Sequence, residues 1–176
     1  MCTLSAMVLK ATTAHLFHVG DARIYRPRGG VLTQLTQDHR IAVSEGRSYL
    51  GRALGVHAQL EVDYQNLQVE VGDVCVLATD GVYECVPDDV IAATIAAAPG
   101  PLDDAAKAIA HAAYAQGSGD NLTVQLLRVD QLAAQGPGVL AVIVVALLVA
   151  LDHASSGRSQ ARTRAPSPAP GIHSAR

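Results

Sequence analysis

The sequence contains no tryptophan and only one phenylalanine, so its core must be built mainly from valine, leucine, isoleucine and alanine. Its 176 residues are enough for one domain with a substantial core and hardly enough for two. The N-terminus lacks the basic segment and apolar stretch of a signal peptide, so we expect none to be present.

Cysteine is also scarce. Cys2, Cys75 and Cys85 are odd in number and show no CxxC spacing. This pattern argues against a disulfide framework and against a zinc site, and it predicts reduced core thiols in a cytosolic domain.

Basic residues are few in most of the chain, whose formal net charge is -3. Residues 1–151 carry 15 acidic and 9 basic side chains, a balance of -6, whereas residues 152–176 carry one acid and four arginines, a balance of +3. A surface that follows nucleic-acid phosphates needs lysine and arginine, so the acidic part argues against a nucleic-acid partner. The acidic character of residues 1–151 is compatible with a metal site.

The most informative stretch is Val74–Ala78, an apolar run of the length expected for a buried strand. Asp80 and Gly81 follow it directly. A carboxylate at the exit of a buried strand is held rigidly, and glycine lets the backbone turn tightly beside it. This arrangement suits a hard divalent cation, which binds oxygen ligands. An ordinary Asp-Gly turn is the alternative interpretation.

Other segments predict an antiparallel meander around this strand. Apolar or alternating residues predict strands over 3–9, 14–20, 60–69 and 122–129, and a hairpin formed by 22–26 and 31–35. Residues 40–59 are predicted to form a loop because glycine and serine interrupt any periodicity. The first strand is expected to belong to a sheet, and no earlier element is available to cover the edge of that sheet.

Two helices are predicted before the last strand. Pro87 and Pro101 each suit the first helical position, and two aspartates follow each of them in the first turn. Apolar residues at helical spacing then continue to Pro99 and to Gly117, where the helices are expected to end. Their alanine-rich faces are suited to close packing on a sheet.

Two further acids are placed like Asp80. Asp21 lies where the second predicted strand passes to the third, and Asp120 lies just before the last strand. Each could be a carboxylate of one common site, and each could equally be an ordinary turn residue.

The C-terminal part changes in composition. Residues 131–136 form a predicted linker and 137–151 an apolar segment, in which 139–151 are apolar without interruption. A membrane-spanning helix usually needs ~20 residues, with ~17 as the short limit, so this segment is borderline. We expect a helix that spans a membrane, with a core segment or a collapsed tail as the alternative. Residues 152–176, rich in Ser, Pro, Ala and Arg, are predicted to be disordered.

Three short motifs occur in a fixed order, with the two predicted helices between the last two. They are Gly20-Asp21-Ala22-Arg23, Ala78-Thr79-Asp80-Gly81 and Gly119-Asp120-Asn121. In this order they resemble the metal-dependent serine/threonine protein phosphatases of the PPM (type 2C) family, in particular bacterial members, some of which are fused to a protein kinase. The resemblance covers residues 3–130. It implies a phosphatase domain over 1–130 with an α+β fold, a four-layer αββα sandwich of two antiparallel sheets flanked by helices, incomplete at the N-terminus.

The resemblance also implies a metal site. Asp80 and Asp120 correspond to ligands of one ion of a Mn²⁺ or Mg²⁺ pair, and Asp21 to the acid that helps to hold a further, weaker ion. The remaining motif residues would support the site: Gly20, Arg23, Gly81 and Asn121.

The implied activity is hydrolysis of phosphoserine and phosphothreonine in proteins by a metal-activated water, without a covalent enzyme intermediate. The implied partners are phosphorylated proteins and a cognate serine/threonine kinase. We expect a cytoplasmic domain, anchored to or in contact with a membrane through 137–151.

The sequence departs from the family in its early part. The phosphate-binding arginine, an acidic ligand and the Asp-Gly-x-Gly-Gly-His type of motif, whose aspartate bridges both ions, have no counterpart in the printed chain. We therefore expect a truncated and weakly active phosphatase. The alternative is a non-catalytic, membrane-tethered interaction module or pseudo-phosphatase fragment. A small-molecule phosphatase is a third, less favoured interpretation.

Overall fold

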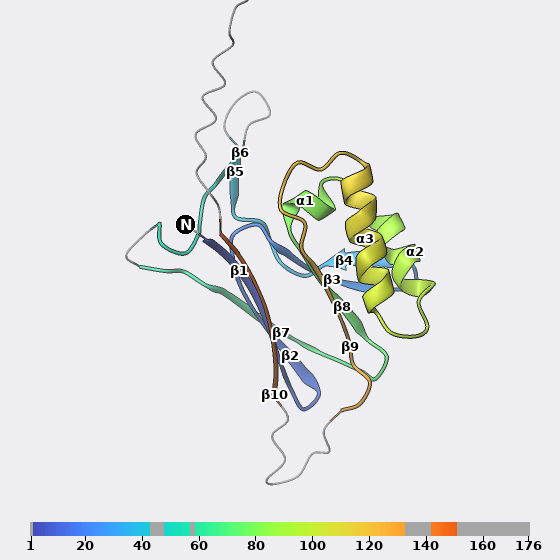
Figure 1. Ribbon diagram of the computed structural model, residues 1–176. Coiled ribbons are helices and arrows are strands. Elements are labelled where there is room, and N and C mark those ends of the chain that lie inside the picture. The colour runs from blue at the N-terminus through green and yellow to red at the C-terminus, as the bar shows by residue number, and fades with distance from the viewer. Residues whose placement is uncertain (1, 43–47, 57–58, 133–141, 151–176) are drawn as a thin grey trace, which may run out of the picture.

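The computed structural model describes residues 2–42, 48–56, 59–132 and 142–150, the side chains of 42, 48 and 142–150 excepted. In these residues two four-stranded antiparallel sheets face one another, and the helices lie over one of the two sheets (Figure 1). One hydrophobic cluster fills the space between the sheets, and a second fills the space beneath the helices.

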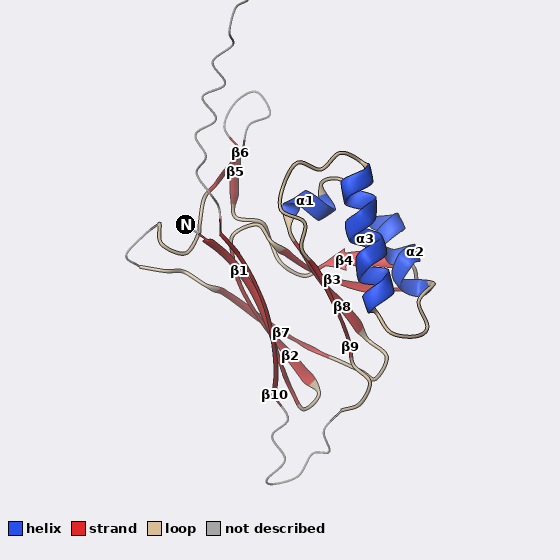
Figure 2. Ribbon diagram, viewed as in Figure 1, coloured by secondary structure: helices blue, strands red, loops and turns tan. Residues whose placement is uncertain are grey.

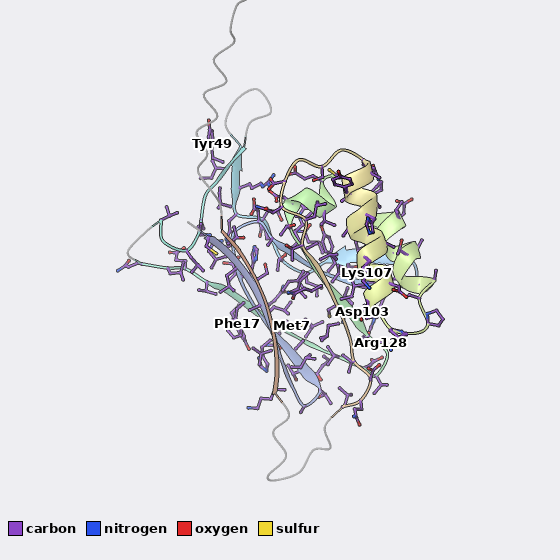
Figure 3. The ribbon with its side chains drawn as sticks, viewed as in Figure 1. Met7, Phe17, Tyr49, Asp103, Lys107 and Arg128 are labelled. Carbon is purple, nitrogen blue, oxygen red and sulfur yellow. The ribbon has the colours of Figure 1, made fainter. Side chains whose placement is uncertain are left out.

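The first sheet has the strand order β10-β1-β2-β7. Its strands are β10 (Val142–Ala150), β1 (Cys2–Lys10), β2 (Thr13–Val19) and β7 (Asp63–Gln68). Burial alternates along β1 and β2, because successive side chains of a strand point to opposite faces. Met7 lies in the cluster between the sheets, and Phe17 lies on the opposite side of the β1–β2 pair (Figure 3).

The second sheet has the order β4-β3-β8-β9. Its strands are β4 (Val31–Gln34), β3 (Arg23–Arg28), β8 (Val74–Ala78) and β9 (Val124–Arg128). The β3–β4 hairpin and the buried strand β8 agree with the sequence predictions. Because β8 is central in a sheet that is covered on both faces, four of its five residues are buried.

Helices cover the outer face of this second sheet (Figure 2). They are α1 (Asp80–Tyr83), α2 (Asp88–Ala96) and α3 (Asp103–Ala115). The helices predicted after Pro87 and Pro101 are present, each with two aspartates in its first turn. The described residues therefore supply three of the four layers expected from the family.

Two short elements differ from the predictions. Residues 40–59 were expected to form a loop, but β5 (Arg40–Ala42) pairs with β6 (Ser48–Leu50) as a small antiparallel ribbon. Strands of three residues are too short to show a periodicity. Asp80 and Gly81, for which an ordinary turn was the alternative interpretation, begin the one-turn helix α1 directly after β8.

The predicted helix over 139–151 is wrong for Val142–Ala150, which form strand β10. This strand pairs with β1 in an unbroken antiparallel register from Cys2 opposite Ala150 to Lys10 opposite Val142. The partner of β10 lies far upstream, because the free edge of β1 is at the other end of the chain. Four valines and an isoleucine among the nine residues favour a strand.

The remaining C-terminal predictions fall largely outside the described residues, which exclude 133–141 and 151–176. No helix in the described part of the chain is long and apolar enough to cross a membrane.

Candidate functional site

The antiparallel register of the second sheet brings three acidic segments to one end of the sandwich. Arg23, which begins β3, lies opposite Ala78, which ends β8, and Ala78 also lies opposite Val124, which begins β9. Asp21 precedes β3, Asp80 follows β8, and the loop with Asp120 precedes β9. The three aspartates named from the sequence therefore lie at the same end of the strands of the second sheet.

The loop that carries Asp120 is fastened to the start of α1 by hydrogen bonds. The Thr79 hydroxyl donates to the carbonyl of Asn121 at 2.7 Å, and the Ser118 hydroxyl donates to the carbonyl of Gly81 at 2.8 Å. Asn121 thus supports the site through its backbone, and its own N–H donates to the Asp120 carboxylate at 2.6 Å. These contacts hold Asp120 beside Asp80.

Gly81 makes this close approach feasible. A Cβ atom at Gly81 would lie 2.8 Å from the carbonyl oxygen of Asn121 and 3.1 Å from the Cβ atom of Asp120. Both distances are shorter than an ordinary contact, so a side chain at this position would push the two segments apart. Gly81 is thus required sterically for the close approach of these two segments.

Arg40, at the start of β5, lies among the carboxylates. Its guanidinium donates to three different acids: Nε to Asp21 at 2.9 Å, Nη2 to Asp80 at 2.9 Å and Nη1 to Glu84 at 2.6 Å. Asp21 is buried, Asp80 is mostly buried and Glu84 is half exposed. The arginine is thus an internal counter-ion for the cluster. Figure 1 shows α1 and β5 at the same end of the sandwich.

Negative charge exceeds positive charge at this site. Burial raises the pKa of Asp80 above its ordinary value, and the charges of Asp21 and Asp120 raise it further. Burial opposes the charge of Arg40, but hydrogen bonds to Asp21 and Glu84 raise its pKa nonetheless. Three carboxylates contact the guanidinium of Arg40, and Asp120 lies near enough to Asp80 to affect its charge, so the cluster favours additional positive charge.

Arg23 supports the site indirectly. Its guanidinium donates to both carboxylate oxygens of Asp38, with Nε at 2.9 and 3.1 Å and Nη2 at 2.6 Å. It also lies over the ring of Tyr83, 3.6 Å from the centroid, and the Tyr83 hydroxyl donates to the carbonyl of Asp21 at 2.9 Å. Arg23 therefore fixes the turn of Asp21 through Tyr83.

Gly20 holds the same turn from the other side. Its φ of 115° is in the region that favours glycine, and a Cβ atom there would collide with the side chain of Thr3. Its N–H donates to Nδ1 of the buried His39 at 3.0 Å. The supporting role expected for Gly20 is therefore conformational.

Sequence reasoning missed Arg40, Glu84, Thr79 and Ser118. Glu84 lies four residues after Asp80, one helical turn away, so its spacing could have indicated it once α1 was recognised. Arg40 had no such signal, because its partners lie far away in the sequence.

The donor types suit a hard divalent cation, since carboxylate oxygens are the preferred protein ligands of Mg²⁺ and are well suited to Mn²⁺. The charge excess points the same way, since the charges of Asp21 and Asp120 add to burial in raising the pKa of Asp80. In the described residues, however, no three His, Cys, Asp or Glu side chains are positioned to hold a metal while Arg40 lies among the carboxylates. The carboxylates are suitable ligands for such an ion. In this structure Arg40 contacts the oxygen atoms that the ion would bind.

Comparison with known proteins agrees with this architecture. The family model described as "Stage II sporulation protein E (SpoIIE)" matches residues 15–130, a range that contains Asp21, Asp80 and Asp120. The "Serine/threonine phosphatase stp" of Listeria monocytogenes is 30% identical over 143 residues, which are 73% of this chain and 56% of the relative. The chain thus spans about half the length of these curated relatives.

Solved structures show the same fold. PppA from Pseudomonas aeruginosa is 30% identical with a TM-score of 0.61, over 66% of this chain and 52% of PppA. The catalytic domain of the serine/threonine protein phosphatase PstP, in complex with two manganese ions, is 23% identical with a TM-score of 0.57, over 84% of this chain and 59% of that domain. The matched segment, the two antiparallel sheets and the order of the three acidic motifs lead to one conclusion: this chain belongs to the PPM-type phosphatase family, of whose domain it comprises a part.

Proposed function

We propose that this chain contributes the Asp21, Asp80 and Asp120 carboxylates to the active site of a metal-dependent protein phosphatase acting on phosphoserine and phosphothreonine. The observation that carries the proposal is the meeting of the three aspartates at one end of the sandwich, where negative charge exceeds positive charge. Phosphorylated proteins are the proposed substrates, and a cognate kinase that produces them is the proposed partner.

Each part of the site has a role in this proposal. Asp21, Asp80 and Asp120 would hold Mn²⁺ or Mg²⁺, and a bound ion of this kind supplies an acidified water and neutralises phosphoryl charge. Thr79 and Ser118 keep the segments of Asp80 and Asp120 together. The manganese complex of PstP supports the choice of ion, at the level of a shared fold.

We further propose that the printed chain alone hydrolyses a phosphopeptide slowly. It matches only 56% of the length of the Listeria relative, and the bridging Asp-Gly-x-Gly-Gly-His type of motif is not in its sequence. Each positioned charge missing from such a site commonly costs ~10²–10³ in rate.

The test is phosphate release from a phosphothreonine peptide with Mn²⁺, using the printed chain and a version extended at its N-terminus by the rest of a PPM domain. We expect turnover near background for the printed chain and clear turnover for the extended one. Asp80→Asn in the extended version should abolish that turnover. Equal turnover by the two lengths would overturn the proposed weakness. An inactive extended version would instead favour the non-catalytic alternative.

The proposed location is the cytoplasm. Cys2, Cys75 and Cys85 are free thiols, and free thiols persist where the compartment is reducing. Fractionation of cells that express the chain would test this location, and recovery from an oxidising compartment would contradict it.

A further inference from the structure

We infer that Arg40 is a built-in competitor of the divalent cation: it neutralises the carboxylate cluster while the metal is absent, and it must leave before the metal can bind. The inference rests on the proposed cation site, and it concerns how that site is regulated. It assigns to Arg40 a role that the motif residues alone do not require.

The competition follows from the atoms that Arg40 contacts. It donates to Oδ2 of Asp21 and to Oδ2 of Asp80, and the other oxygen of Asp80 already accepts the N–H of Gly81 at 2.9 Å. Both oxygens of Asp80 are therefore engaged. An arginine has no lone pair to offer a metal, so it cannot become a ligand in its turn.

Distance and charge make joint occupancy unfavourable. An ion of the Mg²⁺ class binds its oxygen ligands at ~2.1 Å. The nitrogen atoms of Arg40 lie 2.9 Å from the same oxygens of Asp21 and Asp80. A bound cation would therefore be placed within a few ångströms of a guanidinium, and like charges at that separation in a partly buried site repel strongly.

The displaced side chain has somewhere to go. An open pocket of about 280 Å³ adjoins Arg40, and its walls include Arg40 itself, Asp38 and Arg52. Arg40 already influences Asp38. Burial opposes the ionisation of Asp38, hydrogen bonds from Arg23 and Gln34 lower its pKa, and the charge of Arg40 lowers this pKa further. A turn of the Arg40 side chain toward Asp38 would free Asp21 and Asp80 and keep the guanidinium near a carboxylate.

The first test measures Mn²⁺ binding by calorimetry for the printed chain and for Arg40→Gln. Removal of the competitor should tighten binding by about tenfold, the size of a typical coupling between linked events. The matched control is Arg28→Gln, which removes an arginine paired with Asp73 and Glu70 rather than with the cluster. It should leave the isotherm unchanged. Unchanged or weaker binding by folded Arg40→Gln would overturn the inference.

The second test uses the unmodified chain, so it does not depend on how well a variant folds. Mg²⁺ alone is added to protein labelled with ¹⁵N, and the arginine Nε–H signals are followed by nuclear magnetic resonance. The Arg40 signal should shift and exchange faster with water as its bond to Asp21 is lost, while the Arg28 signal stays in place. Mg²⁺ binding that leaves the Arg40 signal unperturbed would overturn the inference.

The two proposals fail in different ways. If the printed chain binds Mn²⁺ and Arg40→Gln binds it no better, the competition is refuted and the proposed phosphatase site stands. If neither chain binds Mn²⁺ at any workable concentration, both the competition and the cation site of these carboxylates are refuted.

Discussion

Opposing effects act on the ionisation of the Asp80 carboxyl group. Burial and the neighbouring Asp21 and Asp120 disfavour its charge, whereas the N–H of Gly81 and the guanidinium of Arg40 favour it. A carboxylate in this situation interacts strongly with any added positive charge. The requirement for Gly81 and the requirement for Arg40 are therefore both consequences of how Asp80 is packed.

Gly81→Ala should lower the free energy of unfolding by about 1–3 kcal/mol, because the new methyl group would press on Asn121 and Asp120. It should also weaken Mn²⁺ binding, since Asp120 would move away from Asp80. Urea denaturation and calorimetry measure the two effects. Gly100→Ala is the control, because a Cβ atom there would meet nothing within 4 Å. Equal stability of the two variants would contradict the packing described for Gly81.

Asp38 links the site to acid stability. Burial opposes its ionisation, but hydrogen bonds from Arg23 hold its pKa below the ordinary value. A carboxyl group with a lowered pKa stabilises the fold above its unfolded pKa of about 4, and this contribution is lost as the pH falls through the folded pKa. The pair with Arg23 therefore stabilises the fold at neutral pH, and this stabilisation is lost in acid.

Asp38→Asn should consequently destabilise the protein by about 1–3 kcal/mol at pH 7, and the difference from the unmodified chain should shrink below about pH 4. Urea denaturation at a series of pH values measures it. Asp130→Asn, which breaks the exposed pair with Arg128, should have little effect at any pH. A constant difference between Asp38→Asn and the unmodified chain down to pH 3 would show that the ion pair does not set the acid limb.

Strand β10 closes the first sheet from the far end of the described chain. It occupies the edge of β1 that the sequence had left without a partner. An uncovered edge strand exposes a row of unpaired backbone groups that invites association with other chains. β10 thus protects β1, and its long apolar run has a role within the fold.

Hydrogen exchange along β1 tests this pairing. In a strand flanked on both sides, amides that point to either neighbour are protected. Ala146→Pro, opposite Ala6, should disrupt β10. Every second amide of β1 should then exchange rapidly, while those facing β2 stay protected. Ala169→Pro, outside the strand, is the control. Fast exchange at alternate β1 amides in the unmodified chain would mean that β10 does not pair there.

The local elements were predictable where the chain itself carries the signal. An apolar run marked β1, weak alternation marked β2, and the proline and aspartate pairs marked the starts of α2 and α3. The pairing of β10 with β1 was not predictable from local pattern, since an apolar run of this length suits a strand and a helix equally well. Only the presence of a free edge decides between them.

At the scale of the whole molecule, the register of the second sheet explains why three distant motifs converge. The acid-bearing ends of β3, β8 and β9 lie at the same end of this sheet, as the order of the motifs had indicated. The contact between Arg40 and the cluster depends on the loop between β4 and β5, whose path no periodicity specifies. The order of the motifs thus indicated Asp21, Asp80 and Asp120, and it gave no indication of Glu84 or of Arg40.

The cluster around Asp80 is proposed to take up a divalent cation. Calorimetry with Mn²⁺ tests it most directly, comparing the printed chain with Asp80→Asn and with Asp104→Asn, an exposed acid on α3 outside the cluster. The account predicts that Asp80→Asn weakens binding by about tenfold or more, while Asp104→Asn leaves the isotherm unchanged. An Asp80→Asn isotherm that superimposes on that of the unmodified chain would contradict it.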